Sequence, residues 1–253
     1  MYHSVYLDHL KHNPFLKNGW FYQVLSQQLA ARLISQGSCG HAAIIGLPET
    51  VRDYWTTVLD GWDISFVSYQ TVAAAPANPM DWPFEKKTLD LCLYGPAWCW
   101  FDPFESALST VRQSIKPGGV MLMVGIGQAT TEDWLLPGVP SWPDMIEIGD
   151  ALQQLDCLQV AISTITVTLT YSNIKQLVQD CQNHGLWVRA GNPSLSDWFQ
   201  WAKSFSRSGS LIRFEVELVF AYAIAASERR GYQDASGRVH VSVDELFSVS
   251  SQG

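Results

Sequence analysis

Residues 104–126 read FESALSTVRQSIKPGGVMLMVGI, and this stretch decides the fold. Its first half has apolar residues three or four positions apart, which predicts a helix over about 104–115. The apolar face of that helix consists of Ala107, Leu108, Val111 and Ile115. The turn Lys116-Pro117-Gly118-Gly119 follows, and the apolar run 120–126 after it has the composition of a buried strand. The stretch therefore predicts a helix that leads through a tight turn into the core of a sheet.

The residues before this stretch alternate between the same two patterns. Apolar runs at 42–45, 64–69 and 89–94 predict strands, whereas 15–33 and 51–59 have helical patterns. Strands that alternate with helices are typical of a parallel sheet covered on both faces. The first half of the chain is therefore predicted to be a doubly wound α/β fold of the nucleotide-binding kind.

The second half of the chain has a different order of predicted helices and strands. A loop over 127–142 leads to a predicted helix at 144–155 and a β-branched strand at 160–170. Ser172 is expected to cap a helix over 173–184, with Gly185 in the position that follows a helix end. A Trp-bearing segment, 186–205, then leads to a long strand at 212–225 and to a charged tail from Ser227 that contains a short apolar alternation.

Composition limits the function classes. Of the 253 residues, 47% are apolar and 16% are charged, and the formal net charge is −8. A negative chain repels backbone phosphates, so we expect no nucleic-acid partner. We also expect no membrane span and no export signal, because no apolar run is long enough and the N-terminus lacks a basic-then-apolar pattern.

The cysteines and histidines show no metal-ligand spacing. An odd number of scattered cysteines without CxxC spacing predicts reduced, mostly buried thiols and a cytoplasmic protein. These cysteines are Cys39, Cys92, Cys99, Cys157 and Cys181. His3, His9 and His12 favour an exposed N-terminal helix over a metal site, because no carboxylate or cysteine completes a ligand set. We therefore expect no metal.

The central block carries a family resemblance. Leu89-Asp90-Leu91, the turn at 116–119 and Met121-Leu122-Met123 together resemble class I S-adenosylmethionine (SAM) methyltransferases. Residues 127–130, 144–152, 167–172 and 214–223 are similar to the BioC-like group, the malonyl-acyl carrier protein (malonyl-ACP) O-methyltransferases of biotin synthesis. The tail at 239–246 is similar to complex I assembly-factor relatives of that group in mitochondria.

This resemblance covers roughly residues 85–246 and implies an architecture. It implies a Rossmann-like sheet that is mostly parallel, with an antiparallel C-terminal strand and a helical lid or insert at about 172–206. The chain then divides into an N-terminal helical segment (1–37), a methyltransferase-like α/β domain (38–226) and a C-terminal tail (227–253).

The resemblance also implies a SAM site, whose positions can be found one by one. The glycine-rich loop after the first strand retains Gly46, but Ile44 stands at its acidic position. The acidic residue that holds the ribose is replaced by Ser68. The adenine acceptor falls near Asn78, ahead of the Leu-Pro-Phe-like motif at Trp82, and Gly95 follows the predicted strand at 89–94. Several of these SAM-site positions have therefore lost the residue types of the family.

The degenerate loop, Gly46-Leu47-Pro48-Glu49-Thr50, also has a purely structural interpretation. Pro48 suits the first turn of a helix, and Glu49 complements the positive end of its dipole. In this interpretation, the Glu49 side chain supplies from within the protein the negative charge that a cofactor would bring.

Three further residues are candidates for a substrate or partner surface. Trp98 and Trp100 lie where the family places the mouth for methyl transfer, and they either wall a substrate tunnel or pack between helix and sheet. Arg189 either meets a carboxylate substrate or an acidic carrier protein, or is an ordinary surface residue. The sequence identifies no catalytic residue.

Two hypotheses follow. In the first, the protein is a pseudo-methyltransferase that has lost or weakened SAM binding and acts through contacts with a paralogous methyltransferase or an assembly partner. In the second, it is an active SAM-dependent O-methyltransferase on malonyl-ACP or a similar carboxylate or thioester in biotin synthesis.

Overall fold

The computed structural model describes residues 20–33, 39–68, 82–101, 103–132, 142–183, 194–226, 232–233 and 239–240. Its helices are α2 (Trp20–Ala30), α3 (Arg52–Val58), α5 (Phe104–Ser114), α6 (Met145–Gln154), α7 (Ile174–Asn183) and α8 (Leu195–Ser204). The described residues also form short 3-10 turns, namely η2 (Glu49–Val51), η4 (Pro96–Trp100) and η5 (Gln128–Thr130). The strands are β1 (His41–Leu47), β2 (Asp63–Ser68), β3 (Leu89–Tyr94), β4 (Ile115–Ile126), β5 (Cys157–Tyr171), β6 (Arg207–Ser208), β7 (Leu211–Ala225), β8 (Tyr232–Gln233) and β9 (Val239–His240).

Seven strands form the main sheet, in the order β2-β1-β3-β4-β7-β5, with β6 paired to β7. The first four of these run parallel, whereas β7 runs antiparallel to both β4 and β5. The mostly parallel sheet with an antiparallel C-terminal strand, predicted from the sequence, is thereby confirmed. Because the amino ends of the parallel strands meet at one edge and their carboxyl ends at the other, the sheet has two chemically distinct edges.

Helices cover both faces, as expected of a doubly wound fold. On one face, α2 and α3 are tied together by a buried hydrogen bond that Trp55 Nε1 donates to Ser26 Oγ, at 3.2 Å. The other face is packed by α5, whose residues Ala107, Leu108 and Val111 are buried as predicted. The start of α6 is fixed by a capping box between Asp144 and Glu147.

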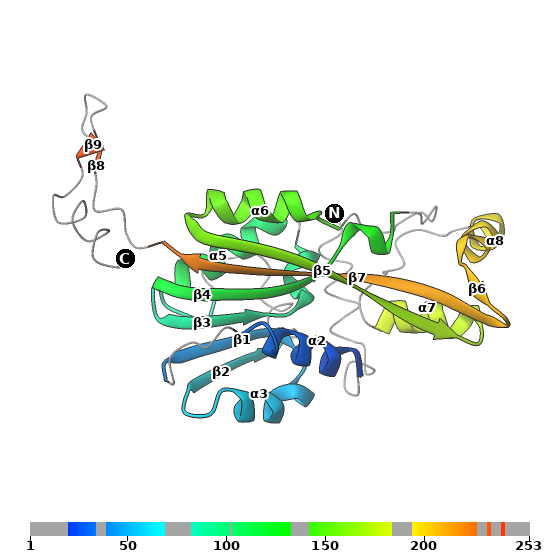
Figure 1. Ribbon diagram of the computed structural model, residues 1–253, viewed down its shortest axis with the longest axis horizontal. Helices are drawn as coiled ribbons and strands as arrows, with labels where there is room; N and C mark the ends of the chain where they lie inside the picture. Colours follow the sequence, from blue (N-terminus) through cyan, green and yellow to red (C-terminus); the bar gives the residue numbers. More distant parts are fainter. Residues whose placement is uncertain are drawn as a thin grey trace, which may run out of the picture.

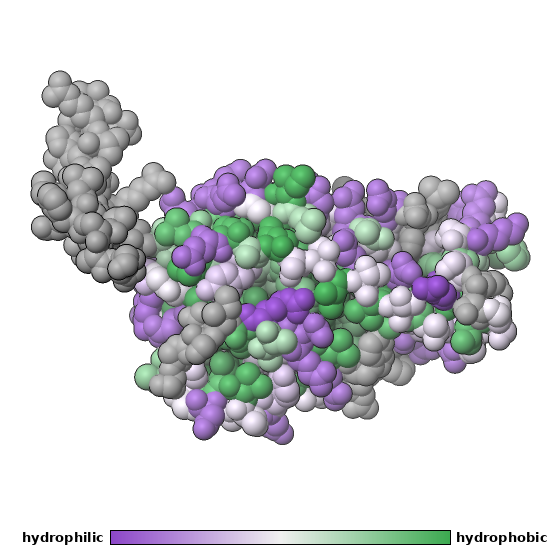
Figure 2. All heavy atoms as spheres, in the orientation of Figure 1, coloured by the Kyte–Doolittle hydropathy of each residue, from purple (hydrophilic) through white to green (hydrophobic). Residues whose placement is uncertain are grey.

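The strands β5 and β7 are longer than the others and project beyond them. Their pairing runs from Cys157 opposite Ala225 to Tyr171 opposite Ile212, whereas β4 contacts only the part of β7 from Leu218 onward. The far half is therefore a ribbon of β5 and β7 that the short strand β6 joins at its end, with α7 and α8 beside it (Figure 1). In the same orientation, Figure 2 shows hydrophobic side chains exposed among polar ones over the sheet.

Several predicted boundaries need correction. The strand predicted at 42–45 continues through Gly46 to Leu47, so the supposed loop glycine is a strand residue. The turn predicted at 116–119 lies within β4, because Ile115 already pairs with Leu89 before a shift in register. Gly118 has a φ of +79°, which accommodates the irregularity.

The cap predicted for the helix after β5 was also wrong. Ser172 Oγ bonds to the side chain of Gln176, whereas Asn173 Oδ1 accepts the backbone N–H of Gln176 at 3.0 Å. Asn173 is therefore the residue whose side chain accepts a free backbone N–H at this helix start, and α7 begins at Ile174.

Some predictions fall outside the described residues or are not tested by them. The three N-terminal histidines and Gly185 lie outside, and the division into three segments stays a prediction. No helix in the described ranges is long and apolar enough to cross a membrane. In the same ranges, no group of three His, Cys, Asp or Glu residues could hold a metal ion.

Candidate functional site

The candidate site is the edge of the sheet where β1 and β3 end, because the family resemblance places SAM there. Gly46 forms a bulge in β1: Ile45 pairs with Val67 and Leu47 with Ser68, and Gly46 is the extra residue between them. Its φ of +71° is a conformation that other residues rarely adopt. The backbone N–H of Gly95 donates to Ile45 O at 2.7 Å, so the segments after β1 and β3 are joined directly.

The two segments also fill each other's space. A Cβ placed on Gly46 would lie 2.7 Å from Ala97 Cβ, which is far inside contact distance. A Cβ placed on Gly95 would lie 2.6 Å from Leu47 Cδ2 and 2.7 Å from Gly46 O. Leu47 and Ala97 are both buried. The side chains of this protein therefore occupy the space between the two segments.

Trp98 continues this packing toward β4. Its indole Nε1 donates to Val124 O at 2.9 Å, and its ring covers Gly125 together with Cys99 Sγ. Trp98 is fully buried, and burial raises the pKa of the Cys99 thiol far above its ordinary value. Within this edge, Trp98 packs between η4 and the sheet and exposes no surface to a ligand.

The start of the following helix carries its own charge pair. Glu49, in the first turn after Pro48, forms an ion pair with Arg52 three residues later. The Arg52 guanidinium also stacks over the Phe66 ring, 4.8 Å from its centroid. The negative charge at this helix start is thus supplied by the chain and balanced by Arg52.

A cluster of hydrogen bonds around Glu217 lies at the end of β4, and the sequence did not predict it. Glu217 of β7 accepts the N–H of Ala129 at 3.1 Å through Oε2, and its carboxylate lies against Gly127. The N–H of Glu217 donates to Thr130 Oγ1 at 2.9 Å, and its backbone O accepts Gly127 N–H at 2.9 Å. An alternating strand makes Glu217 resemble an ordinary solvent-facing residue, and only the fold brings it to this loop.

The predicted site residues are only partly brought together. Gly46, Gly95 and Trp98 meet at the carboxyl edge, and Ser68 pairs through its backbone with Leu47. Trp82 lies elsewhere: its Nε1 donates to Ser114 Oγ at 2.7 Å, at the amino edge of the sheet. Trp100 ends η4. Asn78 and Arg189 lie outside the described residues.

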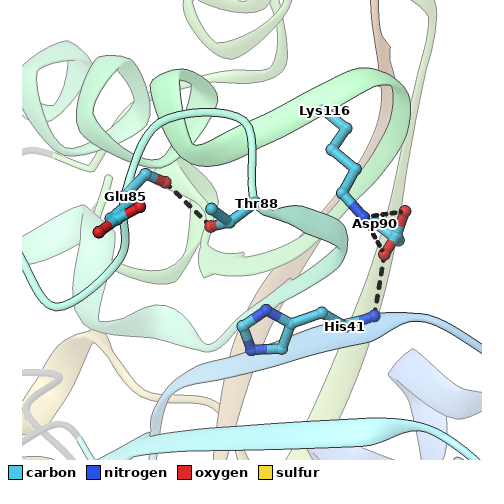
Figure 3. A network of polar contacts seen from close by, with 5 residues as sticks. All are labelled: His41, Glu85, Thr88, Asp90 and Lys116. Carbon is cyan, nitrogen blue, oxygen red and sulfur yellow. Dashed lines mark hydrogen bonds and ion pairs between the residues drawn. The ribbon is translucent and has the colours of Figure 1, made fainter.

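The amino edge instead carries a structural polar network (Figure 3). Asp90 accepts Lys116 Nζ at 2.9 and 2.7 Å, and it also accepts the backbone N–H of His41 at 2.9 Å. Burial acts to raise the pKa of the Asp90 carboxyl, but the hydrogen bonds and positive charge of Lys116 and His41 outweigh it and lower the pKa. This network ties the starts of β1, β3 and β4 together.

The described residues at the carboxyl edge lack two residue types that the family resemblance implies for a SAM site. Ile44 is buried where the family has a carboxylate, and Pro48 offers no backbone donor. Leu47 and Ala97 are buried against Gly95 and Gly46 in the space between the segments that follow β1 and β3.

Comparison with known proteins identifies the fold. No family model matches the chain. Malonyl-ACP O-methyltransferase 1 of Coxiella burnetii is 24% identical over 180 residues, which are 65% of this chain and 64% of that protein. The chain thus matches just under two thirds of that relative's length.

Two solved structures share the architecture. A candidate methyltransferase from Bacillus halodurans matches with a TM-score of 0.53 at 12% identity, over 83% of this chain and 100% of its own. The YcgJ protein of Bacillus subtilis matches with a TM-score of 0.50 at 10% identity, over 81% and 99%. The predicted Rossmann-like methyltransferase fold is confirmed, and so is the resemblance to malonyl-ACP O-methyltransferases. The loss of the cofactor site stays a prediction.

Proposed function

We propose that this protein, which has the fold of the class I methyltransferases, is a pseudo-methyltransferase that acts through protein contacts. The observation that carries the proposal is the mutual packing of Leu47 against Gly95 and of Gly46 against Ala97. In this proposal the sheet edge serves as a closed structural surface and not as a cofactor pocket.

Energetics support the proposal. Each unmade polar contact in a partly buried site costs on the order of 1–3 kcal/mol. The loss of two or three contacts at Ile44, Pro48 and Ser68 would weaken SAM binding by roughly a thousandfold or more. Opening the space between the segments after β1 and β3 would also expose Leu47, which costs a free energy of about 1.5–3 kcal/mol for a fully buried side chain.

The proposed partner is a paralogous methyltransferase or an assembly partner. The similarity to malonyl-ACP O-methyltransferase 1 also makes an acyl carrier protein a candidate. Trp100 and Arg189 remain proposed contact residues, because an aromatic ring and a guanidinium are the side chains most enriched at interfaces.

The test is a calorimetric titration of the full chain with SAM and with S-adenosylhomocysteine, paired with melting curves. A ligand that binds the native state raises its melting temperature, so we expect neither heat nor a shift for this protein. The Coxiella burnetii relative, titrated in parallel, is the positive control. A saturable heat near one-to-one stoichiometry would overturn the proposal.

A second candidate function is methyl transfer to malonyl-ACP or a similar carboxylate. One observation favours it: Gly46 keeps the left-handed conformation that a glycine turn in this position requires, with a φ of +71°. This candidate predicts transfer of labelled methyl from SAM to malonyl-ACP, which stops in Gly46→Val. Unchanged turnover in a folded Gly46→Val protein would count against a role for this turn.

A further inference from the structure

A cavity lies on the face of the sheet, away from the carboxyl edge. It has a volume of about 350 Å³ and is lined by the residues that follow α2 and by strands β4, β7 and β5. Small-molecule pockets in proteins occupy roughly 300–1,000 Å³. The cavity is therefore large enough for a small organic ligand and is distinct from the space around Gly46.

Its floor is mainly apolar. Phe220 is opposite Ser163 on β5, and Tyr222 is opposite both Leu122 on β4 and Ala161 on β5. Residues directly opposite one another in a sheet share a face, so these side chains form one surface. Of the nine lining residues, Arg32 is the single charged one.

Arg32 enters this apolar surface from the end of α2. Its guanidinium lies over the Phe220 ring, 3.9 Å from the centroid. Its Nη1 donates to the backbone O and to Oε1 of Gln28, each at 2.9 Å. Among the described residues, no carboxylate pairs with Arg32, so the Nε and Nη2 donors keep their capacity for an anion.

We propose that this cavity binds a small amphipathic carboxylate. The carboxylate would accept the remaining N–H groups of Arg32, since the planar guanidinium fork matches a carboxylate. The apolar body of the ligand would lie against Leu33, Leu122 and Phe220. Ser163 and Tyr222 line the same space, and their hydroxyl groups can add hydrogen bonds.

The size of the cavity limits the ligand. At about 30 Å³ for each heavy atom at liquid density, the volume holds roughly ten to twelve heavy atoms. Octanoate has that size and combines one carboxylate with an unbranched apolar chain. It is therefore the probe, and 1-octanol is its uncharged counterpart.

The experiment is a calorimetric titration of the full chain with sodium octanoate and with 1-octanol. We expect saturable one-to-one binding of octanoate and at least about tenfold weaker binding of octanol, because a hydrogen-bonded charge pair contributes that much. Arg32→Gln is expected to weaken octanoate binding about 10- to 100-fold. Ser163→Phe, at an exposed residue of the edge strand β5, is expected to abolish binding by filling the cavity.

Matched controls separate this result from loss of structure. Arg213→Gln removes an exposed arginine of β7 that pairs with Glu215, and it should leave octanoate binding unchanged. Circular dichroism checks each fold, and Ser163→Phe decides the question if Arg32→Gln does not fold. Absence of octanoate binding to the native protein, or binding that persists in Ser163→Phe, would overturn the proposal. Equal affinity in folded Arg32→Gln would show that Arg32 only supports the end of α2, and would overturn it as well.

Discussion

Leu47 and Gly95 are interlocked at the carboxyl edge of the sheet, since Leu47 Cδ2 lies where a side chain on Gly95 would have to be. An added Cβ there would be 2.6 Å from Leu47 Cδ2 and 2.7 Å from the backbone O of Gly46. Leu47 is itself fully buried, so it has no open space into which it can turn. The segments that follow β1 and β3 therefore act as one packed unit.

Gly95→Ala is expected to destabilise the protein. Overpacking a well-filled core costs about 1–3 kcal/mol in the free energy of unfolding. Urea unfolding followed by circular dichroism measures this loss. The double variant Gly95→Ala with Leu47→Ala should recover part of it relative to the sum of the two single variants, because Leu47 Cδ2 is gone while Gly46 O remains. Unchanged stability in Gly95→Ala would mean that this edge is loosely packed and open to a ligand.

Gly149→Ala is expected to act in the opposite direction. Gly149 lies inside α6, where a Cβ would meet Ile162 Cδ1 at 3.4 Å, an ordinary contact distance. Alanine favours a helix over glycine by roughly 0.5–1 kcal/mol. The same urea series should show a gain of that size. A loss would show that Ile162 cannot adjust, and that the contact between α6 and β5 is tighter than ordinary packing.

Local patterns in the sequence predicted most of the fold. The apolar spacing of Ala107, Leu108 and Val111 located α5, and the run at 89–94 gave β3 its observed bounds. Capping was harder to predict, because Ser172 and Asn173 both suit a helix start and only the fold decides which side-chain oxygen accepts the backbone N–H of Gln176. The bulge at Gly46 likewise depends on pairing with β2, which no local pattern shows.

The candidate site was less predictable because it depends on contacts between distant segments. The motif around Trp82 was placed by resemblance at the cofactor, whereas its indole bonds to Ser114 at the amino edge. The packing of Leu47 on Gly95 joins residues that are far apart in the chain. Arg32 follows a helix without any motif, and only the folded sheet places Phe220 beneath it.

The cysteines should differ sharply in reactivity. Cys39 is exposed, whereas Cys92, Cys99, Cys157 and Cys181 are buried. Burial raises the pKa of each of these four thiols, which suppresses the reactive thiolate. Iodoacetamide at about pH 8, close to the ordinary thiol pKa, should therefore modify Cys39 first.

Peptide mapping by mass spectrometry checks this order. The four buried thiols should react only in concentrated guanidinium, where all five become equal. Rapid modification of Cys99 in the native protein would contradict the packing of Trp98 and Cys99 over Gly125, and would therefore also weaken the proposed closure of the carboxyl edge.

Asp90→Asn should produce a stability loss that depends on pH. The pKa of the Asp90 carboxyl is lowered in the folded protein: burial alone would raise it, but the hydrogen bonds and charge from Lys116 and His41 outweigh burial. A carboxyl with a lower pKa in the folded state stabilises the fold above its unfolded pKa of about 3.9. That contribution disappears as the pH falls through the folded pKa. The native protein should therefore have a higher free energy of unfolding than the variant at neutral pH, and the difference should shrink in acid.

The size of this effect is limited by solvent. The side chains of Lys116 and Asp90 are 43% and 34% exposed, so the pair is screened and should contribute about 0.5–1 kcal/mol at neutral pH. Urea unfolding of both proteins at a series of pH values measures the difference. Glu215→Gln, which removes an exposed ion pair with Arg213, is the matched control and should change stability by less than about 0.5 kcal/mol. A difference for Asp90→Asn that stays constant below the unfolded pKa would mean that Asp90 is held by its geometry with His41 and not by its charge.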